Sequence, residues 1–447
     1  MSYIGDSFRN LNGWLHSFSI EVFADILKRE WIDEALVQTG RQSQRERKLP
    51  AAFTVWLVIA MSVFRRLSIK NVVHRLGNVL GAGSLWRNGE DPASSSSVEA
   101  RDRVGAAPLH WLARRLSAWI LATHGEAMKW KGLLLLALDG TTLKVPDSDE
   151  NRDRIGLPGS SRGRAAFPQM RALFLVSTQL HFILQTAFAP YGWGEMALAM
   201  HLLSSIPAGT LLLLDRGFIS WKFLLRLRDA QSHFLVRVRR GMKAKRVQRL
   251  GRGDHLANVR IPRQLRRQHP ELSRDVLVRE IVVRIHGTWF RFFTSLLDAS
   301  AYPAVELVQR YRERWEEELM LDEMKTHQCG ATTVNRPVIF RCETPSRVLQ
   351  EAHGLVVAYN LVRAVMAKAA ARRNVSPVRL SFTDSLERIR DAALLMAAAS
   401  TRELPRIYDD LLDAIARCVL PKRRERRLPR EVCIKMSKFR LKRKPAA

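Results

Sequence analysis

The chain has 447 residues, of which 47% are hydrophobic and 26% charged, a composition typical of globular proteins and not of disordered ones. Its 73 lysines and arginines against 43 acids give a formal net charge of +30, which points to a polyanionic partner such as nucleic acid or an acidic membrane surface. No run of about 20 apolar residues predicts a membrane span, and the N-terminus lacks the basic-then-apolar form of a secretory signal. Four cysteines without a CxxC pair suit a reducing interior, and with twelve histidines that lack HxxxH spacing they argue against structural zinc.

Residues 1–130 are predicted to be helical. The apolar run 53–67 is followed by an amphipathic segment, and a serine run that can supply an N-cap precedes a further helix at 97–120. Short helices separated by small-residue turns fit a DNA-reading module and a plain helical scaffold equally well. Of these two interpretations we adopt the first, and we predict that 1–130 is a helical N-terminal DNA-binding domain.

The pattern changes at residue 131 to that of an α/β fold. The run "GLLLLALDG" predicts a strand buried on both faces that ends at Asp139, and a polar loop follows it. A strand pair turning near Gln179, a helix, and a second apolar strand ending at Asp215 come next, followed by another helix and strand. Residues 131–239 are therefore predicted to form the first part of an α/β core.

Residues 240–300 are predicted to be a β-rich basic insertion, with a hairpin that turns at "HGTW". The chain then returns to helix in 301–375, the second part of the core, and 376–447 is predicted to be a helical and basic C-terminal region. Its tail, 421–447, has twelve lysines and arginines and two acids, the profile of an arm that contacts nucleic acid, or of a simple solubility tail.

Asp139 and Asp215 each follow a four-leucine strand. Ligands of α/β folds sit at the carboxyl edge of the sheet, and a carboxylate there is costly unless it is paired or binds a metal. Either aspartate alone would be interpreted as a turn residue or a helix cap. Two aspartates at matched positions, each after a four-leucine strand, favour a functional site.

The segment 310–327, "RYRERWEEELMLDEMKTH", gathers acids in a basic chain. Taken as one helix at about 100° per residue, it places four residues within roughly 60° of arc, as one polar stripe: Tyr311, Arg314, Glu318 and Lys325. Four acids point away from the stripe and are predicted to form a solvated face: Glu313, Glu316, Glu317 and Glu323. Glu318 is then the acid held between cations, and Asp322 is its rival by geometry.

Several motifs resemble the signatures of bacterial insertion-sequence DDE transposases, specifically the type-four group with the YREK motif. They are "DGT" at 139–141 with "VPDSDEN" at 145–151, "LLLLDRGF" at 211–218, Tyr-x2-Arg-x3-Glu-x6-Lys at 311–325, and the basic "LPREVCIKMSKFRLKRK" near the C-terminus. The similarity runs from about residue 20 to the end of the chain.

The resemblance implies an RNase H-like catalytic core, interrupted by a β-rich insertion between the second Asp and the Glu. It implies that Asp139, Asp215 and Glu318 bind two Mg²⁺ or Mn²⁺ ions, which is coherent because hard cations prefer oxygen ligands and two ions can serve an in-line phosphoryl transfer. Water would attack first and free a 3′-OH at the transposon end. Related enzymes then form a hairpin on the excised element, reopen it and join it to target DNA.

The resemblance also implies DNA contacts near the cleaved end by Tyr311, Arg314 and Lys325, for which helix-surface packing is the alternative. Trp289, at the predicted hairpin tip, is the candidate for holding a flipped base, although most of the eleven tryptophans belong to cores. Phosphate contacts are expected from the basic run 243–267, especially Lys243, Lys245, Arg246 and Arg249. Asp147 and Asp149 are read as turn residues and not as ligands.

The predicted partners are double-stranded DNA, as the terminal inverted repeats of the protein's own element and as target DNA, and a second copy of the chain in the DNA complex. The predicted location is the bacterial cytoplasm, in association with the nucleoid. A catalytically silent DNA-binding protein and a basic RNA-binding protein are the alternatives. The acid triad argues against both, because neither needs it.

Overall fold

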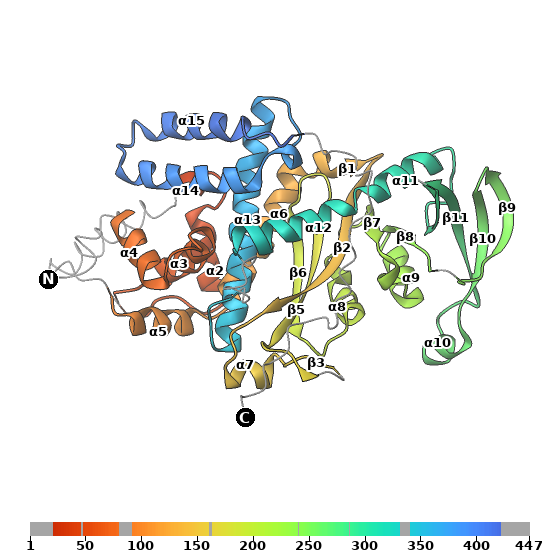
Figure 1. The fold of residues 1–447 in the computed structure, drawn as a ribbon, viewed down its shortest axis with the longest axis horizontal. Helices are drawn as coiled ribbons and strands as arrows, with labels where there is room; N and C mark the ends of the chain where they lie inside the picture. The colour runs from red at the N-terminus through yellow and green to blue at the C-terminus, as the bar shows by residue number, and fades with distance from the viewer. Residues whose placement is uncertain are drawn as a thin grey trace. The chain divides into compact units, whose positions relative to one another are not determined.

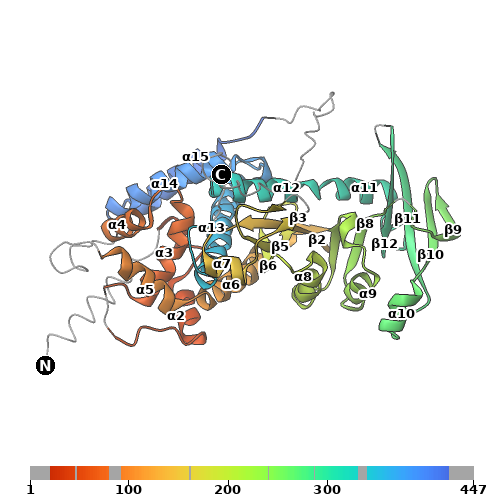
Figure 2. The same cartoon turned by 60° about the horizontal axis from the view of Figure 1, so that its bottom comes forward.

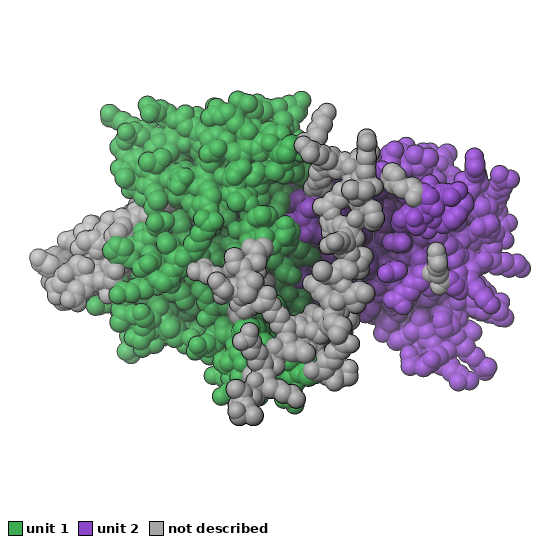
Figure 3. All heavy atoms as spheres, in the orientation of Figure 1, with its two compact units in different colours: residues 1–119, 142–170, 321–447 green, residues 120–141, 171–320 purple. Residues whose placement is uncertain are grey.

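The computed structural model describes residues 21–45, 48–79, 92–160, 163–239, 241–285, 287–330 and 340–421. The predicted basic tail lies outside these residues apart from Pro421. The chain divides into two compact units, coloured separately in Figure 3. The helical unit comprises residues 1–119, 142–170 and 321–447, and the sheet unit comprises residues 120–141 and 171–320. The domain boundaries predicted from the sequence stay predictions.

The helical unit is built around one long helix, α13 (Pro345–Arg372), which packs against α3 (Ala51–Val63), α14 (Phe382–Ala398) and α15 (Leu404–Ala416) (Figure 1). By length and composition alone α13 could cross a membrane, but 89% of its apolar window is buried inside the protein, as in a core helix. The remaining helices of the N-terminal part are α2 (Arg29–Gln38), α4 (Ile69–Val79), α5 (Ser94–Val104) and α6 (Ala107–His124). The predicted helical N-terminal region is confirmed.

A buried charge cluster lies on α13. The Glu351 carboxylate is 1% exposed, forms an ion pair with Arg65, and accepts hydrogen bonds from the backbone N–H of Arg341 at 3.0 Å and from the Cys342 thiol at 2.9 Å. Burial by itself raises the pKa of the Glu351 carboxyl, but the Arg65, Arg341 and Arg101 cations lower it to about 2. The cluster ties α13 to the segment around Arg65 by charge as well as by apolar packing.

The described residues form a ten-stranded sheet, whose first part contains β2 (Leu133–Lys144), β5 (Gln169–Ser177), β6 (Ile183–Pro190), β7 (Thr210–Leu214) and β8 (His233–Arg237). Their order is β6-β5-β2-β7-β8, with β7 parallel to both β2 and β8. Helix α8 (Glu195–Leu202) lies in the connection from β6 to β7, and helix α9 (Trp221–Asp229) lies in the connection from β7 to β8. A strand order of third, second, first, fourth and fifth, with the first, fourth and fifth parallel, is that of an RNase H-like core, so the predicted fold class is confirmed.

The insertion continues this sheet. It contains β9 (Lys245–Gly251), β10 (Asp254–Arg260), α10 (Arg263–Gln268), β11 (Asp275–Ile285) and β12 (Thr288–Thr294). These strands pair antiparallel in the order β8-β12-β11-β10-β9, and Figure 2 shows them extending the sheet from β8 to an edge at β9. The predicted β-rich insertion is confirmed.

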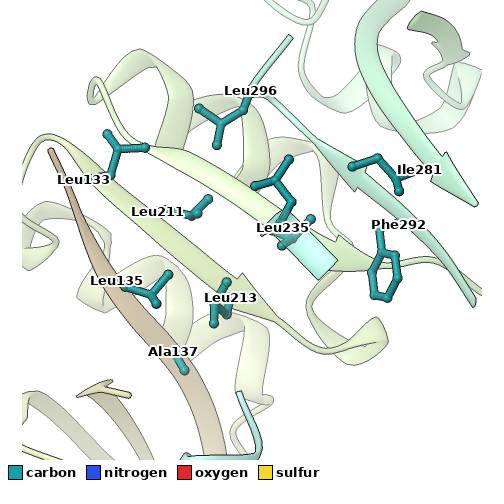
Figure 4. Close-up of a cluster of buried hydrophobic side chains, with 10 residues drawn as sticks. Leu133, Leu135, Ala137, Leu211, Leu213, Leu235, Ile281, Phe292 and Leu296 are labelled. Carbon is teal, nitrogen blue, oxygen red and sulfur yellow. The ribbon is translucent and has the colours of Figure 1, made fainter. Parts of the chain in front are cut away.

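One apolar cluster joins the core to the insertion. Alternate residues of the leucine-rich strands share one face, because side chains in a strand point to opposite faces in turn. Figure 4 shows Leu135 of β2, Leu213 of β7 and Leu235 of β8 on that face, together with Ile281 and Phe292 from the insertion. The insertion therefore shares the buried core of the catalytic strands, and its hairpin is held firmly against them.

Candidate active site

Asp139 lies on β2, and Asp215 directly follows β7, the parallel neighbour of β2 in the sheet unit. The register pairs Leu134 with Thr210 and ends at Ala137 with Leu213, so both aspartates lie just beyond the paired segment, at the carboxyl end of β7. The Asp139 carboxylate accepts a hydrogen bond from the N–H of Gly140 at 2.8 Å. Asp215 caps the short helix η6 (Arg216–Phe218) by accepting from the N–H of Gly217.

One prediction about Asp139 is wrong in detail. β2 does not end at Asp139 but continues to Lys144, well past the end of its pairing with β7 at Ala137; β5 is its neighbour on the other side. The predicted polar loop that follows also contains α7 (Asp149–Arg154) and the short strands β3 (Gly159–Ser160) and β4 (Gly163–Arg164).

The third acid lies on an interrupted helix. The segment consists of α11 (Ala304–Arg312), α12 (Trp315–Asp322) and the π-helical turn η7 (Glu323–Gln328), and is not one regular helix. Glu318 accepts a hydrogen bond from Arg314 at 3.4 Å, with side chains 41% and 17% exposed. Tyr311 is half-buried: its hydroxyl donates to the carbonyl of Leu214 at 3.2 Å, and its ring lies 4.7 Å from that of Phe292.

The predicted solvated face is wrong for Glu317, which is 0% exposed. Across the helix junction the backbone makes i to i+3 bonds, from the N–H of Arg314 to Tyr311 and from that of Glu317 to Arg314. Three residues per turn place Tyr311, Arg314 and Glu317 on one face, so a projection at 100° per residue fails here. Of the other acids of that face, Glu316 is half-buried and lies 3.1 Å from His181, and Glu323 accepts a hydrogen bond from Tyr359 at 2.6 Å.

Burial and neighbouring charges raise the pKa of two of these acids, Asp139 and Glu317. Burial raises the pKa of the Asp139 carboxyl to about 6, the Gly140 N–H and the Arg314 cation oppose this shift, and the charges of Asp215 and Glu318 add to it. Burial also raises the pKa of Glu317, and the charge of Asp139 raises it further. Asp139 and Glu317 are therefore both acted on by neighbouring acid charges that the Arg314 cation offsets only in part, a condition that a divalent cation relieves.

Carboxylate oxygens are the ligands that Mg²⁺ and Mn²⁺ prefer, so the donor set fits the predicted ions in chemistry. The buried Glu317 oxygens, which have no hydrogen-bond partner, fit it too. Within the described residues no three His, Cys, Asp or Glu side chains are gathered as a ready-made site. In this structure Asp139, Asp215 and Glu318 are each engaged by a protein N–H group.

A groove of about 820 Å³ runs from Asp215 to the hairpin of the insertion. Trp289 lines it, and its side chain is 65% exposed. Four arginines line the same groove: Arg216, Arg237, Arg239 and Arg291. The structure thus brings a predicted metal ligand and the predicted base-stacking tryptophan into one cationic cleft.

Comparison with known proteins decides the family. Residues 130–361 match the family model described as transposase DDE domain, and residues 17–114 match the one described as insertion element 4 transposase N-terminal. The chain is 30% identical over 412 residues to the transposase InsG for insertion sequence element IS4 of Escherichia coli K12, which covers 91% of this chain and 90% of that protein. The chain belongs to the IS4-like DDE transposases. Enzymes of this family cut and rejoin DNA with divalent metal ions.

Two further proteins are similar to this transposase. The putative transposase InsZ of Escherichia coli K12 is 34% identical over 221 residues, or 49% of this chain and 71% of that protein. A solved piggyBac transposase synaptic complex with hairpin DNA has a TM-score of 0.35 and 14% identity, covering 94% of this chain and 86% of that chain. At that level the likeness says nothing about the fold or the reaction of this transposase.

The remaining predicted residues of this transposase fall in several places. Lys325 is half-buried in η7, in the helical unit. Asp322 is 56% exposed and lies 3.5 Å from His327. Asp147 binds Arg152 through both oxygens, at 2.6 and 2.7 Å, while Asp149 begins α7, so both have local structural partners.

Four predicted phosphate-binding cations are exposed at or just before the edge strand β9: Lys243, Lys245, Arg246 and Arg249.

Sequence reasoning missed three features of this DDE site. Glu317 was assigned to the wrong face. Arg237 and Arg239 could have been found, since Arg237 ends the buried strand β8 and Arg239 follows it by two positions, where an extended chain keeps side chains on one face. A Cβ at position 140 would lie about 3.0 Å from the side chain of Glu195 on α8, a tight contact that favours the glycine of "DGT"; no sequence pattern marks Glu195 as this neighbour.

Proposed function

We propose that this chain is an active cut-and-paste transposase that cleaves the terminal inverted repeats of its own element and joins the freed ends to target DNA. The observation that supports this most is the position of Asp139 and Asp215 at one edge of the sheet, on β2 and directly after its parallel neighbour β7, with Glu318 of α12 close enough for its charge to act on Asp139. Two acids at a sheet edge with a third from a helix suit metal-dependent phosphoryl transfer.

Asp139, Asp215 and Glu318 would hold two Mg²⁺ or Mn²⁺ ions. The ions supply activation of the attacking oxygen and stabilisation of the leaving oxygen in an in-line displacement. The protein supplies the carboxylates on a rigid sheet and the arginines of the groove, which hold the DNA backbone in position for attack. Water attacks first and frees a 3′-OH, and that hydroxyl then attacks the opposite strand to close a hairpin.

Arg314 and Tyr311 are proposed to act at the cleaved end. Arg314 binds Glu318 in the DNA-free state, and its planar guanidinium can instead take a phosphate through two donors. The Tyr311 hydroxyl is bound to the carbonyl just before Asp215, so it also fixes the end of β7. Lys325, in η7, is proposed as a further phosphate contact.

Trp289 is proposed to receive an extruded base when the hairpin forms. Its ring is exposed, lines the same groove as Asp215, and stands at the tip of the β11–β12 hairpin, where it pairs with Arg284. A base stacked on an aromatic ring gains about 1–3 kcal/mol. That gain offsets part of the cost of unpairing a base so close to a strand break.

We expect Trp289→Ala to reduce hairpin formation about 10- to 100-fold while first-strand nicking changes by less than about threefold, because stacking acts only after the nick. Denaturing gels of end-labelled element DNA measure both products. Trp193→Ala, which removes another exposed tryptophan of the sheet unit, is the matched control. Equal loss of nicking and hairpins in Trp289→Ala would contradict the stacking role.

The exposed edge strand β9 is proposed to bind DNA phosphates. Arg246 also donates to Glu280 at 2.9 Å, an acid that is 2% exposed, so its removal would weaken a buried pair. The other cations are better suited to mutation.

We expect the triple variant Lys243→Ala, Lys245→Ala and Arg249→Ala to weaken DNA binding to all sequences alike and to lower the slope of log K against log salt by about 3, roughly 0.9 per lost phosphate contact. Fluorescence anisotropy over a salt series measures the slope. A control with three exposed arginines of the helical unit changed to alanine removes the same charge: Arg402, Arg406 and Arg417. Matching slopes in both triple variants would mean that β9 contributes only net charge.

The partners follow from the reaction. Two element ends must be cut and joined together, so we propose a homodimer in the DNA complex, and a bacterial cytoplasmic location in association with the nucleoid. The test of the function combines purified protein, Mg²⁺ and linear DNA that carries the ends of the encoding element. Metal-dependent 3′-OH release at the end, absent with unrelated DNA, is expected. End-specific binding without cleavage would indicate a silent DNA-binding protein, and preference for RNA in competition would indicate an RNA-binding one.

A further inference from the structure

Glu317 is the one acid of the segment Glu313–Glu318 that is fully buried. Neither of its carboxylate oxygens has a hydrogen-bond partner among the described residues. The acids on either side of it do: Glu316 lies 3.1 Å from His181, and Glu318 accepts from Arg314. Glu317 is thus the acid of this stretch whose hydrogen-bonding capacity is unused.

A buried carboxylate without a partner is costly, whereas an apolar side chain of the same size would fill the space at no such cost. The charged groups around Glu317 identify the cluster of side chains that its carboxylate faces. The charges acting on Glu317 are those of Asp139, Arg314, Glu318 and Asp215, in that order, and all of them belong to the sheet unit. The unused carboxylate therefore belongs to the same cluster as the proposed metal ligands.

We propose that Glu317 is a fourth carboxylate of the catalytic centre and supplies an oxygen ligand to a divalent cation held there by Asp139, Asp215 and Glu318. The inference rests on the proposed two-ion centre and adds a ligand that the family motif does not contain. Mg²⁺ and Mn²⁺ take about six oxygen ligands each, so three carboxylates leave positions for a fourth.

Arg314 does not remove the need for such a partner. Its guanidinium is already bound to Glu318, and the charges of Asp139 and Glu317 act on it as well. The i to i+3 bonding across the helix junction turns Glu317 toward this cluster along with Tyr311 and Arg314, so the backbone irregularity has a direct use.

We expect replacement of Glu317 to raise the stability of the metal-free protein and to lower its affinity for Mn²⁺. Without metal, Glu317→Leu should raise the unfolding temperature, because it removes a buried unpaired acid. With metal, the same variant should bind Mn²⁺ at least about tenfold more weakly, as should the isosteric Glu317→Gln. A purely structural role for Glu317 would not produce greater stability together with weaker metal binding.

The experiment titrates Mn²⁺ into the full-length protein without DNA and follows free Mn²⁺ by electron paramagnetic resonance, with thermal unfolding of the metal-free variants in parallel. Glu316→Gln, a neighbouring acid directed at His181, is the matched control and should bind Mn²⁺ within about twofold of wild type. Asp139→Asn tests the centre itself and should also weaken binding.

The outcomes separate the two ideas. One outcome is that Glu317→Gln and Glu317→Leu bind Mn²⁺ as wild type does, while Asp139→Asn loses binding. This result would overturn the role of Glu317 and leave the proposed two-ion centre intact. Unchanged binding in Asp139→Asn as well overturns the centre and the inference that rests on it.

Discussion

Replacing Asp139 or Asp215 by asparagine is expected to lower the rate of cleavage at element ends by about a thousandfold or more, with end-specific DNA binding retained. Asparagine keeps the size of the side chain and an oxygen that can accept from Gly140 or Gly217, so the local backbone bonds survive. What is lost is the negative charge that a divalent cation requires. Single-turnover cleavage of labelled DNA with Mg²⁺ measures the rate.

Asp147→Asn is the matched control for these two variants. Asp147 lies eight residues after the "DGT" aspartate, in the "VPDSDEN" stretch, but its partner is Arg152, so cleavage should stay within about threefold of wild type. Wild-type rates in Asp139→Asn or Asp215→Asn would contradict the metal-binding role of that residue.

Replacing Glu351 is expected to be the most damaging single change in the helical unit. Glu351→Gln leaves Arg65 buried without its anion, a loss of about 3–5 kcal/mol in the free energy of unfolding. Denaturant titration of the full-length chain, followed by helical circular dichroism, measures the loss. Glu387→Gln removes a carboxylate that is 41% exposed and paired with Arg390, so it should cost less than about 1 kcal/mol.

The same pair predicts a pH dependence. The pKa of Glu351 is about 2 in the folded protein and near 4.5 when unfolded, so its contribution to stability is fully present above about pH 4.5 and is lost as pH falls toward 2. The difference in unfolding free energy between wild type and Glu351→Gln should therefore be constant from pH 7 to 5 and shrink below that. A difference that persists unchanged at the lowest pH at which the protein remains folded would contradict the ion pair as its source.

The sequence was sufficient for most of the sheet because the strands have simple signatures. Four leucines in a row before each aspartate predict strands that are buried on both faces, as β2 and β7 are; that these two strands are parallel neighbours does not follow from the leucine runs. The β11–β12 hairpin was predictable from two alternating runs around a glycine turn, and with it the position of Trp289. That Trp289 lies in the same groove as Asp215 was not predictable, because this position depends on how β12 pairs with β8.

The segment from Tyr311 to Lys325 shows where pattern reasoning stopped. No proline or glycine between 304 and 328 marks the two changes of helix type, so a uniform 100° per residue was the natural choice. The chain nevertheless makes i to i+3 bonds at Arg314 and a π-helical turn at η7, in a stretch where Glu317 and Met324 are buried. These changes in the number of residues per turn shift the faces on which the acids lie.

The most direct test of the account compares wild type with Glu318→Gln and Asp322→Asn on linear DNA carrying the element ends, with Mg²⁺, reading 3′-OH release on a denaturing gel. The account predicts that cleavage is lost in Glu318→Gln and kept in Asp322→Asn, whose carboxylate is exposed and close to His327. Cleavage that survives in Glu318→Gln but is lost in Asp322→Asn would contradict the assignment of Glu318 as the third acid of the site.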